Sequence, residues 1–103
     1  MQEIIIDLNS KSLNEVAGSY RTFGNQVKLA LGAMFGGISM PTTVKGSKQD
    51  IQAFLDTLVK EKKYMMAYMN YGLNDARTYR NKASLNSAVS KFERVTGIMW
   101  PFK

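Results

Sequence analysis

The sequence contains no cysteine and no histidine among its 103 residues. Without cysteine there is neither a disulfide framework nor thiolate chemistry. The missing histidine removes the commonest general base and the commonest transition-metal ligand. The eight acidic residues show no paired-carboxylate spacing of the kind that a metal or glycosidase site needs. We therefore expect a non-enzymatic binding protein without a cofactor or a metal ion.

Long apolar runs are also missing. Residues 29–40 are uncharged, but these twelve residues fall short of the roughly 20 that span a bilayer. The N-terminus carries Glu3 and Asp7 around a short apolar run, which is unlike a signal peptide. These features predict no membrane association and a cytoplasmic location. The length predicts a single domain, residues 1–103.

The charge is unevenly distributed along the chain. The formal net charge is +6, and residues 46–103 hold ten Lys/Arg against five Asp/Glu. Residues 1–45 hold four Lys/Arg and three Asp/Glu. An anionic partner is therefore expected to bind the second half.

The first half has the pattern of strand, helix, strand. Residues 3–8 are β-branched and predict a strand, and the three consecutive isoleucines favour burial on both of its faces. A capping box at residues 12–15 predicts the start of an amphipathic helix that ends at Gly36-Gly37. The glycines within it indicate either close backbone packing or a break near Phe23-Gly24. Residues 38–45 predict a second strand, which Pro41 confines to an edge or a bulge.

The second half has the pattern of helices. Ser47 is the predicted N-cap of a helix that Gly72 ends, with a kink or short break at the lysine cluster of residues 60–63. A polar turn follows, and Ser84 is the predicted N-cap of a last helix that ends at Gly97. The terminal Trp100-Pro101-Phe102 is costly to leave in water, so it should fold back on the core or onto a neighbouring subunit.

Together these elements predict an α+β fold that is mostly helical, with two short strands and three to four helices. A two-stranded sheet is marginal on its own in water. Either the strands pair as a β-α-β unit covered by helices, or another copy of the chain extends the sheet. We expect a homo-oligomer that completes the small sheet.

The candidate binding site lies in residues 60–82, where tyrosines alternate with basic residues. Three of the tyrosines recur at i, i+4 and i+7 and share a helix face. Aromatic faces beside cationic donors suit a ligand with bases and phosphates, and the two arginines three apart could hold a phosphate near the helix start at Ser84. The alternative is that the tyrosines pack in the core or at a subunit interface and the charges are solvated. The candidate ligand-binding residues are Lys62, Lys63, Tyr64, Tyr68, Tyr71, Arg77, Tyr79, Arg80 and Lys82.

Residues 44–103 also resemble the small accessory proteins of tailed bacteriophages. The strings that carry the resemblance are Lys45-Gly46-Ser47, Glu61-Lys62-Lys63-Tyr64, Tyr71-Gly72-Leu73, residues 92–98, and Trp100-Pro101-Phe102-Lys103. The resemblance implies a role in counter-defence, in transcription or DNA handling, or in virion assembly. For a phage-encoded chain, the location would be the host cytoplasm.

The leading hypothesis is an oligomeric protein that binds a nucleotide-type anion, in its sharpest form a sponge for cyclic-nucleotide immune messengers. The second hypothesis is a structural or protein-interaction module, in a virion or on a host protein, whose interface is the face of tyrosines and methionines. The third is a general nucleic-acid binder, for which we expect weak, salt-labile binding to duplex DNA.

Overall fold

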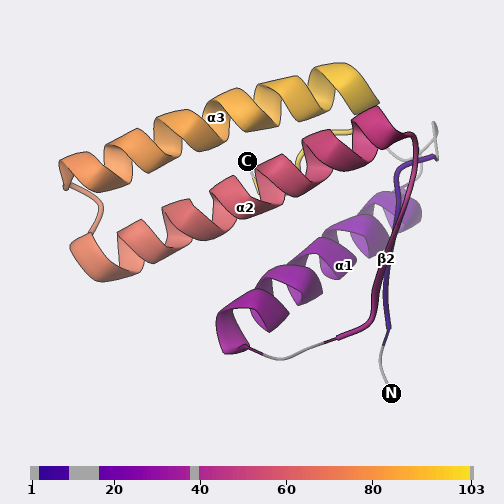
Figure 1. Cartoon of the computed structure of the whole chain (residues 1–103), viewed down its shortest axis with the longest axis horizontal. Helices are drawn as coiled ribbons and strands as arrows, with labels where there is room; N and C mark the ends of the chain where they lie inside the picture. Colours follow the sequence, from indigo (N-terminus) through magenta and orange to yellow (C-terminus); the bar gives the residue numbers. More distant parts are fainter. Residues whose placement is uncertain (1–2, 10–16, 38–39, 103) are drawn as a thin grey trace.

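The computed structural model describes residues 3–9, 17–37 and 40–102. Its elements follow the order β1 (Ile4–Asp7), α1 (Ala17–Gly36), β2 (Thr42–Lys45), α2 (Lys48–Tyr71) and α3 (Ala76–Thr96) (Figure 1). The predicted α+β, mostly helical fold with two short strands is confirmed. The helices α2 and α3 form a long antiparallel hairpin, and α1 and the strands lie along one side of it (Figure 1).

The two strands pair in parallel, with Ile4 opposite Thr42 and Asp7 opposite Lys45. Since α1 connects them, the β-α-β arrangement is confirmed. Ile4 and Ile6 are buried, but Ile5 is 45% exposed because α1 covers only one face of the sheet. The prediction that the isoleucines are buried on both faces is therefore wrong. Pro41 lies just before β2, where its carbonyl accepts the Ile4 amide at 2.8 Å, so the ladder needs no bulge.

The helix α1 is continuous through Gly24, so no break occurs there. A Cβ at Gly24 would lie 3.5 Å from the side chain of Pro101, an ordinary van der Waals distance, so the C-terminal segment passes close to the helix without requiring a glycine there. The buried face of α1 is formed by Phe23, Val27, Ala30 and Leu31. The helix ends at Gly36, as predicted. The predicted capping box at residues 12–15 lies outside the described residues, as does the predicted strand start at residues 38–39.

The helix α2 begins as predicted, with the Ser47 hydroxyl accepting the Asp50 amide at 3.1 Å. It then runs without interruption to Tyr71, so the predicted kink at residues 60–63 is wrong. Consecutive helical residues point about 100° apart, and the charged cluster is therefore spread around the helix instead of displacing one apolar face. Glu61 is the member that turns inward and is buried.

The helix α3 begins nine residues earlier than predicted. Asp75, not Ser84, is its N-cap, and its carboxylate accepts the Arg77 amide at 2.8 Å. Residues 77–82 are consequently helical, and the prediction that they form a turn is wrong. Thr78 favours this early start because its buried hydroxyl donates to the carbonyls of Gly72 and Ala67, at 2.6 and 3.3 Å. The helix ends at Gly97, as predicted, in the left-handed conformation that favours glycine.

The core is closed by the C-terminal segment. Trp100 is 2% exposed and packs nearly perpendicular to Phe92, with the ring centres 5.3 Å apart. Its indole Nε1 donates to Oε1 of the buried Glu61 at 3.0 Å, and its backbone amide donates to Glu93 at 2.9 Å. Of the two predicted positions for this segment, the structure shows the one on the chain's own core.

Candidate functional site

The second half of α2, which carries the predicted tyrosines, extends beyond the end of α1 (Figure 1). By helical spacing they point to the same side as the core-facing residues nearer the start of α2. Tyr64 is half-buried and packs against the core, whereas Tyr68 is 48% exposed. Tyr68 therefore remains in contact with solvent.

Tyr64 and Tyr68 belong to an apolar hollow between the end of α1 and the second half of α2. Its volume is about 360 Å³. No cation is present among the described residues that line it, so it lacks donors for phosphate groups. We call it the tyrosine–methionine hollow; its lining residues are Phe35, Tyr64, Met65, Tyr68 and Met69.

Arg77 is engaged within the chain. Its guanidinium donates to both carboxylate oxygens of Asp75, at 2.9 and 3.0 Å, and lies 3.4 Å from the ring centre of Tyr71. The bonds from Arg77 lower the pKa of Asp75 to about 2, and the Asp75 carboxylate in turn raises the pKa of Arg77. The start of α3 thus already carries an anion of its own. The predicted phosphate clamp of Arg77 with Arg80 would have to break these contacts.

The remaining predicted residues do not converge on one point. Lys62 is half-buried and Lys63 is exposed, and as neighbours in a helix they project in different directions. Tyr79 is exposed and its hydroxyl donates to Asn74 at 3.3 Å. Arg80 and Lys82 are both exposed on α3. The structure therefore assembles no compact site from the predicted set.

A different arrangement emerges along α3, on the side opposite its buried residues Leu85, Val89 and Phe92. All side chains on this outer side are exposed. We call it the α3 ridge; its members are Tyr79, Arg80, Ala83, Asn86, Ser87, Ser90, Lys91 and Arg94.

The α3 ridge carries positive charge without a carboxylate. The helix, which the structure describes in full, has five Lys/Arg and one acid, Glu93. Oε2 of Glu93 accepts the Trp100 amide, so this carboxylate is directed toward the C-terminal segment. Sequence reasoning identified Arg80 but missed Lys91 and Arg94. Extending the helix back to Asp75 would have revealed them as members of the same face.

The groove between α2 and α3 borders the ridge. It has a volume of about 560 Å³ and a largely polar lining that includes Gln49, Gln52, Asp56 and Lys91. Asp56 is thus an acid at the margin of the ridge. Its carboxylate lowers the attraction of this margin for an anion.

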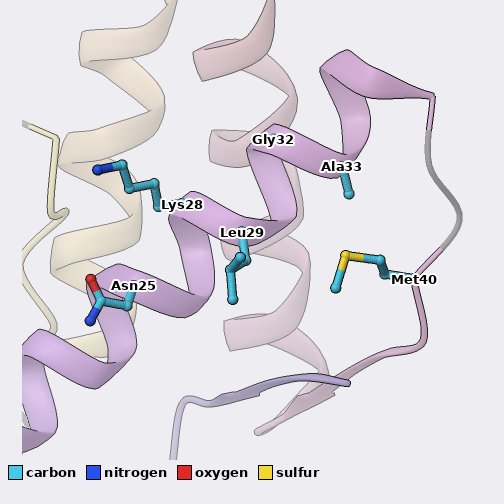
Figure 2. A pocket seen from close by; sticks show the side chains of 6 residues that line it. All are labelled: Asn25, Lys28, Leu29, Gly32, Ala33 and Met40. Atoms are coloured by element: carbon cyan, nitrogen blue, oxygen red, sulfur yellow. The ribbon is translucent and has the colours of Figure 1, made fainter. Parts of the chain in front are cut away.

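A further hollow, of about 540 Å³, lies on α1. Figure 2 shows Leu29 and Met40 beside it, from α1 and from the segment before β2, with Asn25 and Lys28 nearer the start of α1. Its surface is mainly apolar, and Lys28 is the one charged residue among the described residues that line it.

Comparison with family models, curated proteins and solved structures finds no match for this chain. Among the described residues, no group of three His, Cys, Asp or Glu side chains could hold a metal ion. None of the described helices is both long and apolar enough to cross a membrane. The candidate function therefore depends on the geometry of the α3 ridge and of the tyrosine–methionine hollow.

Proposed function

We propose that this protein binds nucleic acid and that the α3 ridge contacts the phosphate backbone. The observation that carries the proposal is the concentration of charge on one helix. The helix α3 holds five of the 14 basic residues and one of the eight acids, and its exposed side has no carboxylate. Arg, Lys, Ser, Asn and Tyr are the side chains that donate to phosphate oxygens, and the ridge contains all five.

The extent of the charge favours an extended polyanion over a small nucleotide. Arg80 and Arg94 are 14 residues apart, which corresponds to about 21 Å along a helix. One mononucleotide or cyclic dinucleotide would reach only part of this row. A nucleic acid repeats its charges along its length and can contact the whole of it.

The binding of a nucleotide-type ligand by the tyrosines stays a prediction. Such a ligand needs cations beside the stacking rings, and within the described chain none lines the tyrosine–methionine hollow. A second subunit would have to supply them. The phage roles and the cytoplasmic location also stay predictions, and of these roles DNA handling agrees best with the ridge.

The test compares two double variants with the same change in charge. Arg80→Ala/Lys91→Ala removes a cation from each half of the ridge, and Arg21→Ala/Lys28→Ala removes one arginine and one lysine from the exposed surface of α1. Binding to a fluorescent 20-bp DNA duplex is measured by anisotropy between 50 and 200 mM salt. We expect the slope of log K against log salt to become shallower by about 1.8 in the ridge variant, since each lost phosphate contact removes about 0.9.

The control variant should retain the slope of the unmodified protein. Equal effects of the two double variants would show that only net charge matters and would contradict the ridge. Absence of nucleic-acid binding by the unmodified protein at 50 mM salt would refute the proposed function itself.

A second proposed function is self-association through the tyrosine–methionine hollow. The observation that favours it is the exposure of large apolar side chains there, with Met69 70% and Tyr68 48% exposed. Flexible thioethers adapt well to an interface. This proposal retains the expected homo-oligomer but moves its contact from the sheet to the helices.

A further inference from the structure

We propose that α3 binds in the major groove of duplex DNA, with its axis along the groove. The inference rests on the proposed function and specifies its ligand. It follows from the order of side chains along the ridge. Cations lie in both halves, Arg80 in the first and Lys91 and Arg94 in the second, with short side chains between them.

The cations are spread along the length of the helix. Arg80 and Lys91 are eleven residues apart, about 16 Å along the helix axis. The major groove is about 12 Å wide and admits an α-helix. A helix lying along it has a phosphate backbone on each side over its whole length, so Arg80 in the first half and Lys91 in the second can each reach phosphates. Arg94 adds a second phosphate contact in the same half of the helix as Lys91.

The middle of the ridge suits a close approach to the bases. Ala83, Ser87 and Ser90 are all short and exposed, so they allow the helix backbone to enter the groove. Serine hydroxyls can bond to base edges, and the exposed amide of Asn86 has the donor and acceptor pair that matches adenine. The minor groove, about 6 Å wide, is too narrow for a helix.

Other nucleic acids fit this arrangement less well. The major groove of duplex RNA is deep and narrow, and side chains cannot read it. Proteins that hold single strands stack several bases on aromatic rings, whereas Tyr79 is the one aromatic residue of the ridge. The ridge therefore selects duplex DNA over both.

The helix is held in place before any ligand binds. The Thr57 hydroxyl donates to the Ala88 carbonyl at 3.2 Å, and the Thr78 hydroxyl donates to the Ala67 carbonyl at 3.3 Å. These two bonds join α3 to α2 at points ten residues apart, and both ends of α3 are capped. A ridge that is already ordered loses little conformational entropy on binding.

The first experiment measures competition and groove occupancy with the full chain. A 20-bp DNA duplex, an RNA duplex of the same sequence and the single DNA strands compete at 50 mM salt. We expect the DNA duplex to bind at least about tenfold more tightly than either competitor. On that duplex, dimethyl sulfate reports both grooves, because it methylates guanine N7 in the major groove and adenine N3 in the minor groove. The bound protein should protect guanine N7 and leave adenine N3 reactive.

The second experiment adds bulk at the middle of the ridge without changing its charge. Ser87→Leu/Ser90→Leu should weaken binding to the DNA duplex by about fivefold or more, because the longer side chains hold the helix away from the bases. The matched control, Asn70→Leu at an exposed position of α2, should bind like the unmodified protein. Thermal melting confirms that both variants fold, as expected for substitutions at exposed positions.

The outcomes separate the two proposals. Equal affinity for duplex DNA, duplex RNA and single strands, or protection of adenine N3 instead of guanine N7, would overturn the major-groove inference and leave nucleic-acid binding intact. Unchanged affinity of the Ser87→Leu/Ser90→Leu variant would also overturn the inference. Failure to bind any of the three nucleic acids would refute both proposals.

Discussion

Replacing Trp100 by Phe should remove one buried hydrogen bond while keeping an aromatic ring in the core. The indole Nε1 of Trp100 donates to Oε1 of Glu61 at 3.0 Å, and both side chains are buried. Phe has no donor, so the carboxylate loses its partner. The ring contacts with Phe54 and Phe92 are partly retained, because these centres lie 6.0 and 5.3 Å from the indole.

The expected cost has two parts. A hydrogen bond to a charged group contributes about 1.5–3 kcal/mol. The smaller ring leaves unfilled volume that costs about 1–2 kcal/mol more. The sum, about 2.5–5 kcal/mol, is a large share of the roughly 5–15 kcal/mol by which a domain is stable. For about 100 residues, each kcal/mol lowers the melting temperature by about 4–8 °C, so we expect a fall of at least about 10 °C.

Urea denaturation followed by far-UV circular dichroism measures this loss, because Trp100 is the only tryptophan and its fluorescence disappears with the substitution. The same change is made in a Glu61→Gln background, where the acceptor is neutral. There the cost should be smaller by about 1 kcal/mol, since a neutral bond contributes about 0.5–1.5 kcal/mol. Equal costs in the two backgrounds would refute the charge-assisted bond as a stabilising interaction.

The remaining predictions concern Glu61, Asp56 and Met69. Burial raises the pKa of Glu61 above 4.5, against the opposing effect of the hydrogen bond from Trp100. The protonated carboxyl therefore contributes its full share to the free energy of unfolding below pH 4.5, and this contribution is lost as the pH rises through the folded-state pKa. Glu61→Gln should therefore stabilise the protein at pH 7 and change little at pH 4 in urea titrations; destabilisation at pH 7 would contradict this sign. Asp56→Asn should strengthen binding to duplex DNA about two- to threefold at 50 mM salt by removing an acid beside Lys91, and weaker binding in anisotropy would count against the ridge. Met69→Glu should reduce self-association measured by light scattering, whereas Leu55→Glu, at an exposed α2 position outside the hollow, should not; a monomeric unmodified protein at high micromolar concentration would remove this proposal.

Local patterns predicted most of the fold. The β-branched run of β1, the Ser47 cap of α2 and the Gly97 end of α3 are all encoded within a few neighbouring residues, and each is confirmed. The burial of Trp100 followed from the cost of exposing it, and the structure selects the chain's own core over a neighbouring subunit. Such features depend on interactions between residues that are close in sequence, so a single sequence is enough to predict them.

The start of α3 depends on contacts that are distant in sequence. Asp75 and Ser84 are both good N-cap residues, and the apolar stripe begins only at Leu85. What favours Asp75 is the Thr78 hydroxyl, which reaches the carbonyl of Ala67 on the neighbouring helix. That bond exists only once the hairpin has formed.

The same difficulty affected the candidate site. Counting charges in residues 60–82 placed Arg77 among the ligand-binding residues, but its pairing with Asp75 and stacking on Tyr71 arise from the turn between α2 and α3. Lys91 and Arg94 share a helix face with Arg80 only if the helix begins near Asp75. The predicted start at Ser84 therefore concealed this shared face. The proposed ridge lies in the half of the chain that the sequence singled out by its positive charge, and the three-dimensional arrangement selected its residues.

The parallel pairing of β1 with β2 has a consequence for how the chain folds. Ile4 pairs with Thr42, so this contact encloses a loop of more than 30 residues, whereas only four residues connect α2 to α3. Closing the longer loop costs about 2 kcal/mol more in chain entropy. The helical hairpin is therefore expected to form first, and the sheet to assemble onto it. Substitutions between α2 and α3 would slow folding, while substitutions at Ile4 or Ile6 would chiefly accelerate unfolding.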